Sequence, residues 1–419
     1  MNLARHSLSS STPLHLFDTR FDPDFAIFTT TTPAGFAVYQ SWPLKLIRKR
    51  ELHGGTLAAV VPLHTSNLLF LLGGGRSPLY PPNKVVLWDD ALGAPVAELE
   101  FRERVRGLAC RRGWLAVALR RRVVVFQVGV KVTHYAEWDT SDNPRGLLAM
   151  ATKPHSTLLA IAGRQIGHVQ LIHLPPCPDP GPVGKPFSFP AQKPHKSPMS
   201  HNVSIIAAHT SALNTISLPP SGRLLATTSS RGTLVRIWDS MTGKLIRELR
   251  RGTDKAEIYG VAFRPDEREL CVWSDKGTVH VFTLTVSGAA SNRQSTFSPL
   301  TPFIPLPKYF GSEWSYAQYR IPVQSSHISL STNPAVHSPV LDPPDEERCV
   351  VGWIRYTDVK TEEKGSAFQY QLIALTYTGG WYRLSLPPQA DLATSGSGRR
   401  GTESVLEEYR RYGRWDGWG

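Results

Sequence analysis

The sequence predicts an all-β fold, a seven-bladed WD40-like β-propeller, because one strand-pair phrase recurs, its period is about 40 to 50 residues, and two copies end in Trp-Asp. Each copy is a short apolar run, a small polar turn, and β-branched residues that end in an aromatic or large aliphatic anchor. Val, Ile, Thr and aromatic residues with a period of two favour strands, and sustained helical periodicity is hard to find before the final thirty or so residues. Such a ring has few free edges, so roughly 390 residues can form one domain.

The seven copies follow one another along the chain. The weakest opens it, FAIFTTTTPAGFAVYQ at 25–40. The others are LLFLLGGG…NKVVLWDD at 68–90, GWLAVALRRRVVVFQV at 113–128, TLLAIAGRQIGHVQLIHL at 157–174, GRLLATTSSRGTLVRIWDS at 222–240, ELCVWSDKGTVHVFTL at 269–284 and QLIALTYTGGWYRLSL at 371–386. The Trp-Asp pairs at 88–89 and 238–239 lie where a WD-type blade ends its third strand.

Three inserts and a tail interrupt the predicted ring, which takes up residues 1–390. Residues 175–200 carry too many prolines for a strand, and we expect them to link blades four and five. Residues 285–312 lengthen blade six, and residues 331–366 lengthen blade seven. Residues 391–419 are expected to be a flexible Gly/Ser stretch followed by about two helical turns and an aromatic, basic end. This tail could dock on the ring or stay loose, and a loose tail is favoured.

The composition indicates an anionic partner. The 419 residues include 47 Lys or Arg against 34 Asp or Glu, a net charge of +13, which suits nucleic acid or a phospholipid surface. No stretch reaches the roughly 18 apolar residues of a spanning helix, and no secretory signal is visible, so we expect a cytoplasmic chain. The cysteines lie far apart and read as reduced thiols, with no metal site and no cofactor expected; they are Cys110, Cys177, Cys271 and Cys349.

Three other functions are considered for this basic chain: an enzyme, a nucleic-acid-binding protein and a protein-interaction scaffold. HExxH, GxSxG and the P-loop motif are absent, and no nucleophile and base pair stands out, so we do not expect an enzyme. Residues 101–122 carry eight arginines, but no aromatic stacking pattern accompanies them, which favours a solvated rim or a protein-docking face over a nucleic-acid site. A WD-type protein-interaction scaffold without lipid binding stays as the alternative.

The most informative local feature is the run Leu249-Arg250-Arg251-Gly252. Successive side chains of an extended chain point to opposite faces, so the two arginines diverge and can serve two separate anion sites. Gly252 removes a side chain beside them and allows a ligand to approach the backbone. On the doublet alone, two solvated surface arginines are the more common explanation.

The flanking blades favour anion binding. Both repeat Ser, then Gly-Thr, then a basic or imidazole side chain, and hydroxyl, guanidinium and imidazole groups all bind phosphate oxygens. The residues before the doublet are His209, Ser229, Arg231, Thr233 and Arg236, and those after it are Ser274, Lys276, Thr278 and His280. Two equivalent phosphate pockets are chemically sensible. If His209 and His280 donate as imidazolium, binding should strengthen between about pH 7.5 and pH 6.

These phrases resemble a known family. LRRGTDKAEIYGVAF, ATTSSRGTLVRIWD, GGGRSPLYPPNKVVLWDD and LPKYFGSEWSYAQYRIP are similar to the PROPPINs, WIPI-type seven-bladed propellers that bind phosphoinositides, and most similar to the small-insert branch with the fungal homologues of the autophagy propeller. The resemblance implies a first headgroup site of Arg250 with His209, Ser229, Thr233 and Arg236. It implies a second site of Arg251 with Ser274, Thr278 and His280. Arg231 stands where many relatives have Lys.

The blade-six insert adds a third contact. From Lys276 through Ser312 there is no Asp or Glu, and apolar residues lie among prolines between Arg293 and Lys308. They are Phe297, Leu300, Phe303, Ile304 and Leu306. Exposed apolar side chains in a basic loop suit the interface of an anionic membrane, although the loop could instead fold back on the propeller. In the resembled family the equivalent loop inserts into the bilayer.

The resemblance also implies a function. It indicates a peripheral membrane effector, expected to be monomeric, that reads phosphatidylinositol 3-phosphate and phosphatidylinositol 3,5-bisphosphate on vacuolar, endosomal and preautophagosomal membranes. It further implies recruitment of the autophagic lipid-transfer protein, or other trafficking machinery, through blades two and three.

Overall fold

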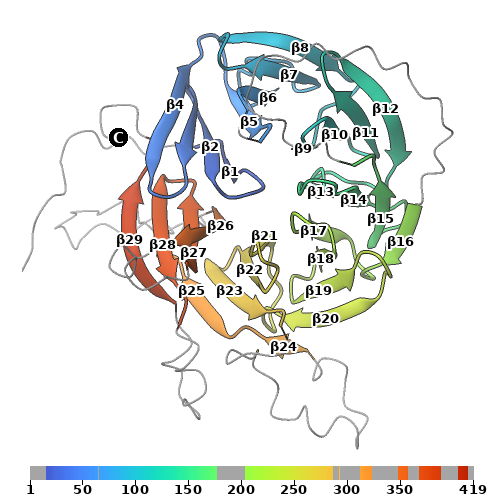
Figure 1. The fold of residues 1–419 in the computed structure, drawn as a ribbon, viewed down its shortest axis with the longest axis vertical. Helices are drawn as coiled ribbons and strands as arrows, with labels where there is room; N and C mark the ends of the chain where they lie inside the picture. The colour runs from blue at the N-terminus through green and yellow to red at the C-terminus, as the bar shows by residue number, and fades with distance from the viewer. Residues whose placement is uncertain are drawn as a thin grey trace, which may run out of the picture.

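The protein is a ring of seven sheets whose strands pair antiparallel, except for one short parallel strand at the outer edge of one sheet (Figure 1). The computed structural model describes residues 16–64, 66–176, 203–285, 292, 312–322, 348–356, 368–387 and 404–413. Within these ranges no helix is long and apolar enough to cross a membrane. The predicted all-β, seven-bladed propeller is confirmed.

The first four blades take their strands in chain order. Blade one contains β1 (Asp18–Phe21), β2 (Ile27–Thr32), β3 (Gly35–Gln40) and β4 (Lys45–Glu51), and blade two contains β5 (Leu57–Pro62), β6 (Leu68–Gly73), β7 (Lys84–Asp89) and β8 (Ala94–Glu100). Blade three contains β9 (Gly107–Arg111), β10 (Trp114–Ala118), β11 (Arg122–Val128) and β12 (Val132–Asp139). Blade four contains β13 (Leu148–Met150), β14 (Leu158–Ala162), β15 (His168–His173) and β16 (Val203–Ala207).

The last three blades depart from simple chain order at one strand. Blade five contains β17 (Leu213–Ser217), β18 (Leu224–Ser229), β19 (Leu234–Asp239) and β20 (Leu245–Arg250), with β24 (Glu313–Trp314) added outside. Blade six contains β21 (Ile258–Phe263), β22 (Glu269–Ser274), β23 (Thr278–Thr283) and β25 (Ala317–Arg320). Blade seven contains β26 (Cys349–Tyr356), β27 (Gln369–Thr376), β28 (Gly380–Ser385) and β29 (Val405–Arg411).

Each recurring phrase of the sequence forms the second and third strands of a blade. These middle strands are almost wholly apolar because both of their faces are covered: all five residues of β10 and of β14 are buried. The outer strand β8 has no fully buried residue. Trp88 and Trp238 lie one position before the ends of β7 and β19, as the Trp-Asp pairs predict.

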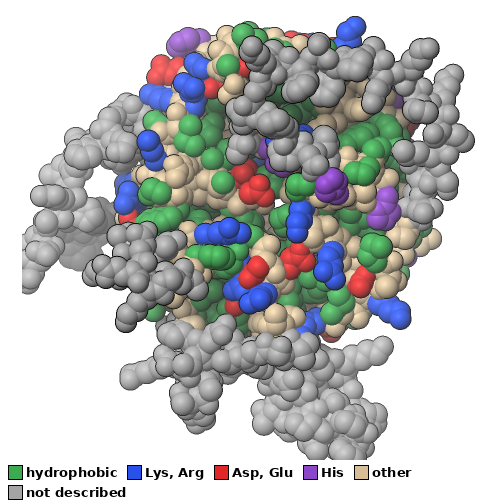
Figure 2. Space-filling view, in the orientation of Figure 1, with side chains coloured by type: hydrophobic (Ala, Val, Ile, Leu, Met, Phe, Trp, Pro, Cys, Tyr) green, Lys and Arg blue, Asp and Glu red, His purple; other side chains and the backbone are tan. Residues whose placement is uncertain are grey.

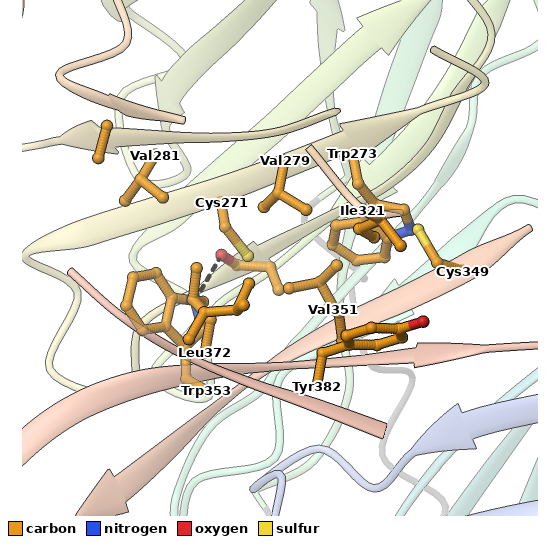
Figure 3. Packing of buried hydrophobic residues seen from close by; sticks show 14 of the residues in the cluster. Cys271, Trp273, Val279, Val281, Ile321, Cys349, Val351, Trp353, Leu372 and Tyr382 are labelled. Atoms are coloured by element: carbon orange, nitrogen blue, oxygen red, sulfur yellow. Dashed lines mark hydrogen bonds between the residues drawn. The ribbon is translucent and has the colours of Figure 1, made fainter. Parts of the chain in front are cut away.

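Neighbouring blades pack through clusters of buried side chains. Figure 3 shows the cluster between blades six and seven, where Cys271 and Val281 face Trp353 and Leu372. The indole Nε1 of Trp353 donates to the carbonyl oxygen of Ala262 at 3.0 Å, so the large ring is buried without leaving its polar atom unpaired.

The join between blades three and four contains a fully buried arginine, Arg111. Its Nη1 donates to the carbonyl oxygen of Ser156 at 2.6 Å and to that of Ala151 at 3.3 Å, and its Nη2 donates to the carbonyl oxygen of Pro175 at 2.7 Å. The guanidinium therefore holds three chain segments of blade four against the end of β9.

Two predicted inserts are placed differently from the expectation. Residues 175–200 were expected between blades four and five, but they fall between β15 and β16, so they connect the third and fourth strands inside blade four. The span 331–366 is not a single insert, since β26 lies within it. The prolines of 175–200 indicate a segment that is not a strand, but they do not say which pair of strands it joins.

The expected helical turns and loose tail are wrong for residues 404–413. Val405–Arg411 form β29, which pairs antiparallel with β28 as the outer strand of blade seven. Tyr412 is buried against Phe28 and Tyr39 of blade one. The propeller therefore extends beyond residue 390 and uses this segment to complete its last blade.

Candidate anion-binding site

The arginine doublet lies at the end of the outer strand of blade five. Arg250 is the last residue of β20 and pairs with Leu234 of β19 on one side and, in parallel register, with Trp314 of β24 on the other. Arg251 follows the strand, and its backbone N–H donates to the carbonyl oxygen of Thr233 at 2.9 Å. The extended backbone expected for the doublet is thus present at Arg250.

Arg250 is directed toward β24. Its Nε donates to the hydroxyl oxygen of Ser312 at 2.8 Å, and its guanidinium carbon lies 5.8 Å from the centre of a Trp314 ring. Stacking on an indole and a hydroxyl contact hold the charge in place while the side chain stays half-buried.

Arg251 has different surroundings and is buried, with 7% of its surface exposed. Its Nε donates to the carbonyl oxygen of Gly232 at 3.1 Å, and its Nη2 donates to that of Asp254. Burial lowers the pKa of Arg251 from its ordinary value, while the nearby carboxylates of Asp275 and Asp254 act in the opposite sense. Backbone carbonyls thus hold this guanidinium without neutralising it.

His209 and Arg236 lie together beside blade five. Arg236 donates from Nη1 to the carbonyl oxygen of Ala208 at 2.7 Å and from Nε to the carboxylate of Glu248 at 2.9 Å. The Nε2 atom of His209 lies 3.0 Å from the Thr227 hydroxyl oxygen. Burial, and then the charge of Arg236, lower the pKa of His209 to about 4. Two members of the predicted first site are therefore neighbours.

His280 lies on the Arg251 side of the doublet. Its Nδ1 atom lies 3.1 Å from the Ser315 hydroxyl oxygen, and burial, and then the charge of Arg251, lower its pKa to about 4. Ser274 and Thr278 flank the turn before β23; Ser274 is buried and Thr278 is half-buried. Members of the predicted second site thus share one neighbourhood.

Both histidines are therefore neutral at neutral pH in the free protein. The imidazolium form, on which a strengthening of binding between about pH 7.5 and pH 6 depended, is not populated there because burial opposes the charge. A neutral imidazole still offers one N–H donor to a phosphate oxygen.

The remaining residues of the predicted headgroup sites have less direct contact with the arginine doublet. Ser229 ends β18, while Arg231 is exposed in the turn that precedes Thr233 and β19. Thr233 meets the doublet through its backbone, because its carbonyl oxygen accepts from the Arg251 N–H at 2.9 Å. The predicted membrane-contacting residues lie outside the described residues; they are Phe297, Leu300, Phe303, Ile304 and Leu306.

Sequence reasoning missed three contacts of the site. Glu248 faces Arg236 across the β19–β20 pair, and a strand period of two, counted back from Arg250, could have placed it on the Arg250 face. Ser312 and Trp314 hold Arg250, but they lie more than sixty positions away and reach it only because β24 joins blade five. No pattern in the neighbouring sequence indicates that β24 is added to the sheet of blade five.

Basic side chains are not confined to the doublet. On the face in Figure 2, Lys and Arg lie along the edge near β4 and over the lower part of the ring, where blades five to seven are found. Charge density alone therefore does not single out the site, whereas burial and fixed contacts do.

Comparison with known proteins identifies the family. SVP1-like protein 2 of Pichia angusta is 32% identical over 340 residues, which cover 80% of this chain and 86% of that protein. SVP1-like protein 2 of Emericella nidulans is 33% identical over 324 residues, which cover 75% of this chain and 92% of that protein. The family's sequence profile, PROPPIN, matches residues 197–328. The chain belongs to the PROPPIN family.

Solved structures show the same fold for this PROPPIN. Hsv2 of Kluyvelomyces marxianus has a TM-score of 0.64 at 19% identity, with 95% of this chain and 99% of that chain covered. A complex of KlAtg21 with the coiled coil of AgAtg16 has a TM-score of 0.59 at 15% identity, with 96% and 100% covered. The resemblance to the PROPPINs drawn from the sequence is confirmed, and the profile match includes the doublet.

Proposed function

We propose that this PROPPIN is a non-catalytic, phosphoinositide-binding peripheral membrane effector of autophagy and of endosomal and vacuolar trafficking. It reads phosphatidylinositol 3-phosphate and phosphatidylinositol 3,5-bisphosphate through two headgroup sites, one at Arg250 and one at Arg251. Membership of the family and the basic character of the chain support this function.

One observation carries the two-site proposal: the adjacent arginines have separate surroundings. Arg250 contacts Ser312 of the β24 segment, whereas Arg251 contacts the carbonyl oxygen of Gly232 in the β18–β19 turn and lies near His280. A guanidinium binds phosphate oxygens in a bidentate manner, and nearby hydroxyl and imidazole groups can donate to the remaining oxygens. One headgroup at each arginine accounts for the arrangement.

The apolar loop between Arg293 and Lys308 completes the proposed membrane contact. A basic residue near an anionic leaflet contributes about 1 kcal/mol, and burying a large apolar side chain contributes about 1.5 to 3 kcal/mol. A single headgroup contact is therefore weak and reversible. Two headgroup sites and a loop engaged together raise avidity through effective concentration, so recruitment responds steeply to phosphoinositide density.

The proposed partner surface lies away from the doublet. Blades two and three would recruit the autophagic lipid-transfer protein or other trafficking machinery. A propeller of the same fold has been solved with a coiled coil, in the complex of KlAtg21 with AgAtg16. The proposed location is cytoplasmic, with reversible attachment to vacuolar, endosomal and preautophagosomal membranes.

Vesicle flotation tests the two headgroup sites. Wild type is compared with Arg250→Thr plus Arg251→Thr, on vesicles with and without phosphatidylinositol 3-phosphate. The matched control is Arg121→Thr plus Arg122→Thr, an adjacent and exposed doublet on blade three. We expect the first variant to lose lipid-dependent flotation and the control to keep it. Unchanged, lipid-dependent flotation of the first variant would sink the two-site proposal.

Deleting residues 295–307 separates headgroup reading from insertion. We expect the deletion variant to bind a soluble inositol 1,3-bisphosphate like the wild type, and to float poorly with vesicles. Normal flotation of the deletion variant would count against a role of the loop in the membrane contact.

A further inference from the structure

A second candidate binding site lies on another part of the ring. A pocket with a volume of about 570 Å³ is lined by residues of blades one and seven, next to the β21–β22 turn of blade six. Its apolar lining includes Phe25 and Trp42 of blade one and Trp353 and Tyr370 of blade seven. The doublet, by contrast, lies on the outer strand of blade five (Figure 1).

Arg355 supplies the cationic group of this pocket. Its guanidinium carbon lies 4.9 Å from the ring centre of Phe368 and 5.9 Å from that of Tyr370, and its Nε donates to the Tyr370 hydroxyl oxygen at 3.3 Å. Among the described residues, no carboxylate forms an ion pair with Arg355. Aromatic rings therefore orient an exposed guanidinium whose charge is not neutralised by those residues.

The pocket walls are held firmly. Trp42 stacks on Trp381 with ring centres 6.0 Å apart, and the guanidinium carbon of Arg383 lies 4.6 Å from the Trp42 ring centre. Phe25 has a backbone φ of 59°, a conformation that costs energy for a bulky residue and is often retained at binding sites. Ile47, at the mouth of the pocket, is about half exposed, as is Phe368 beside Arg355. Rigid aromatic walls reduce the ordering cost of binding.

We propose that this pocket binds an extended peptide that presents a large apolar side chain to the aromatic wall and a carboxylate to Arg355. Trp, Tyr and Arg around a concave apolar centre are the residues that dominate the affinity of protein interfaces. Charge complementarity selects an acidic peptide, because Arg355 offers its donors to a carboxylate. The carboxylate of Asp24, also in the lining, disfavours a second acidic group on the peptide. This site does not depend on the proposed lipid binding.

Display selection tests the proposal with a defined probe. A library of random twelve-residue peptides is selected on the full-length wild-type chain, and enriched peptides are synthesised with a fluorescent label for anisotropy titrations. We expect a shared pattern of a large apolar residue close to Asp or Glu. We expect Arg355→Glu to weaken binding by about tenfold or more, since a charge-assisted hydrogen bond becomes a repulsion. A peptide with Lys in place of its acidic residue should then bind Arg355→Glu better than wild type.

Two further variants test whether the effect of Arg355→Glu is specific to the pocket. Arg121→Glu changes the net charge by the same amount on blade three and should leave peptide binding unchanged. Ile47→Ser, at the mouth, should weaken binding without a change in charge preference. The proposal is overturned if no peptide is enriched, if enriched peptides lack acidic residues, or if they bind Arg355→Glu as tightly as wild type. Dimerisation of the chain that Arg355→Glu abolishes would also overturn it, in favour of a second copy as occupant.

Discussion

Arginines are abundant both on blade three and around the doublet of blade five, but their partners differ. On blade three, Arg120 lies 2.7 Å from the Asp142 carboxylate and Arg122 lies 3.3 Å from that of Glu137, with all four side chains about half exposed. Arg251, in contrast, is buried and donates to backbone carbonyl oxygens.

The partners of an arginine separate a merely basic surface from an anion-binding site. Exposed ion pairs contribute little energy and leave long side chains mobile, and their charge is already balanced. A carbonyl oxygen fixes a guanidinium in position but leaves its full positive charge for a ligand. Counting arginines does not distinguish the two regions, whereas burial and partner type do.

The largest expected effect is on the stability of the fold. It concerns Arg111, which belongs to blade three but is buried and donates to backbone carbonyl oxygens, as Arg251 does. We expect Arg111→Met to lower the free energy of unfolding by about 3 kcal/mol or more, because buried carbonyls lose their donors at about 1 to 3 kcal/mol each. Arg121→Met, at an exposed position of the same blade, should change it little. Urea unfolding measures both. Equal midpoints for the two variants would contradict a structural role of the buried guanidinium.

Single substitutions in the doublet test whether Arg250 and Arg251 serve two separate headgroup sites. Arg250→Thr and Arg251→Thr should each remove one of two sites, so calorimetric titration with inositol 1,3-bisphosphate should give one bound ligand in place of two. Vesicle affinity should fall by about tenfold or more in each single variant, because avidity is lost. A variant that keeps both sites would show that its arginine belongs to the scaffold. Arg122→Thr is the matched control.

Arg236 is the site arginine that most resembles those of blade three, since Glu248 pairs with it at 2.9 Å. Glu248→Gln should tighten headgroup binding by a few fold, because a negative charge beside the phosphate is removed. Glu137→Gln makes the same change opposite Arg122 and should have no effect on binding. Weaker binding by Glu248→Gln would mean that the carboxylate positions Arg236 more than it competes with the ligand.

The smallest expected effect is on binding near neutral pH. With the pKa values of His209 and His280 near 4 in the folded chain, these two imidazoles should add little to the pH dependence of headgroup binding between about pH 7.5 and pH 6. The unfolded chain, with histidine pKa values near 6.5, binds more protons between about pH 6.5 and pH 4, so stability should fall as pH is lowered through that window. His209→Gln plus His280→Gln should flatten that fall in thermal unfolding. An unaltered profile would count against the burial of both imidazoles.

Local patterns predicted the ring and the doublet but not the connections. Strand pairs such as those ending at Trp88 and Trp238 are specified by residues next to one another in sequence. The segment VLEEYRR at 405–411 carries helix formers and no alternation, yet the open edge of β28 makes it a strand. The contacts of Ser312 and Trp314 with Arg250 likewise depend on a distant strand joining a blade.

The meeting of blades seven and one has a consequence for the order of folding. Blades seven and one are neighbours in the ring although their strands come from opposite ends of the described chain (Figure 1). The Gly413 N–H donates to the Tyr39 hydroxyl 374 positions away, and Tyr412 packs on Phe28. The entropic cost of closing a loop rises with its length, and contacts between distant residues form slowly. We therefore expect the ring to close last. The earlier blades would already form an open arc when β29 pairs with β28 and completes blade seven.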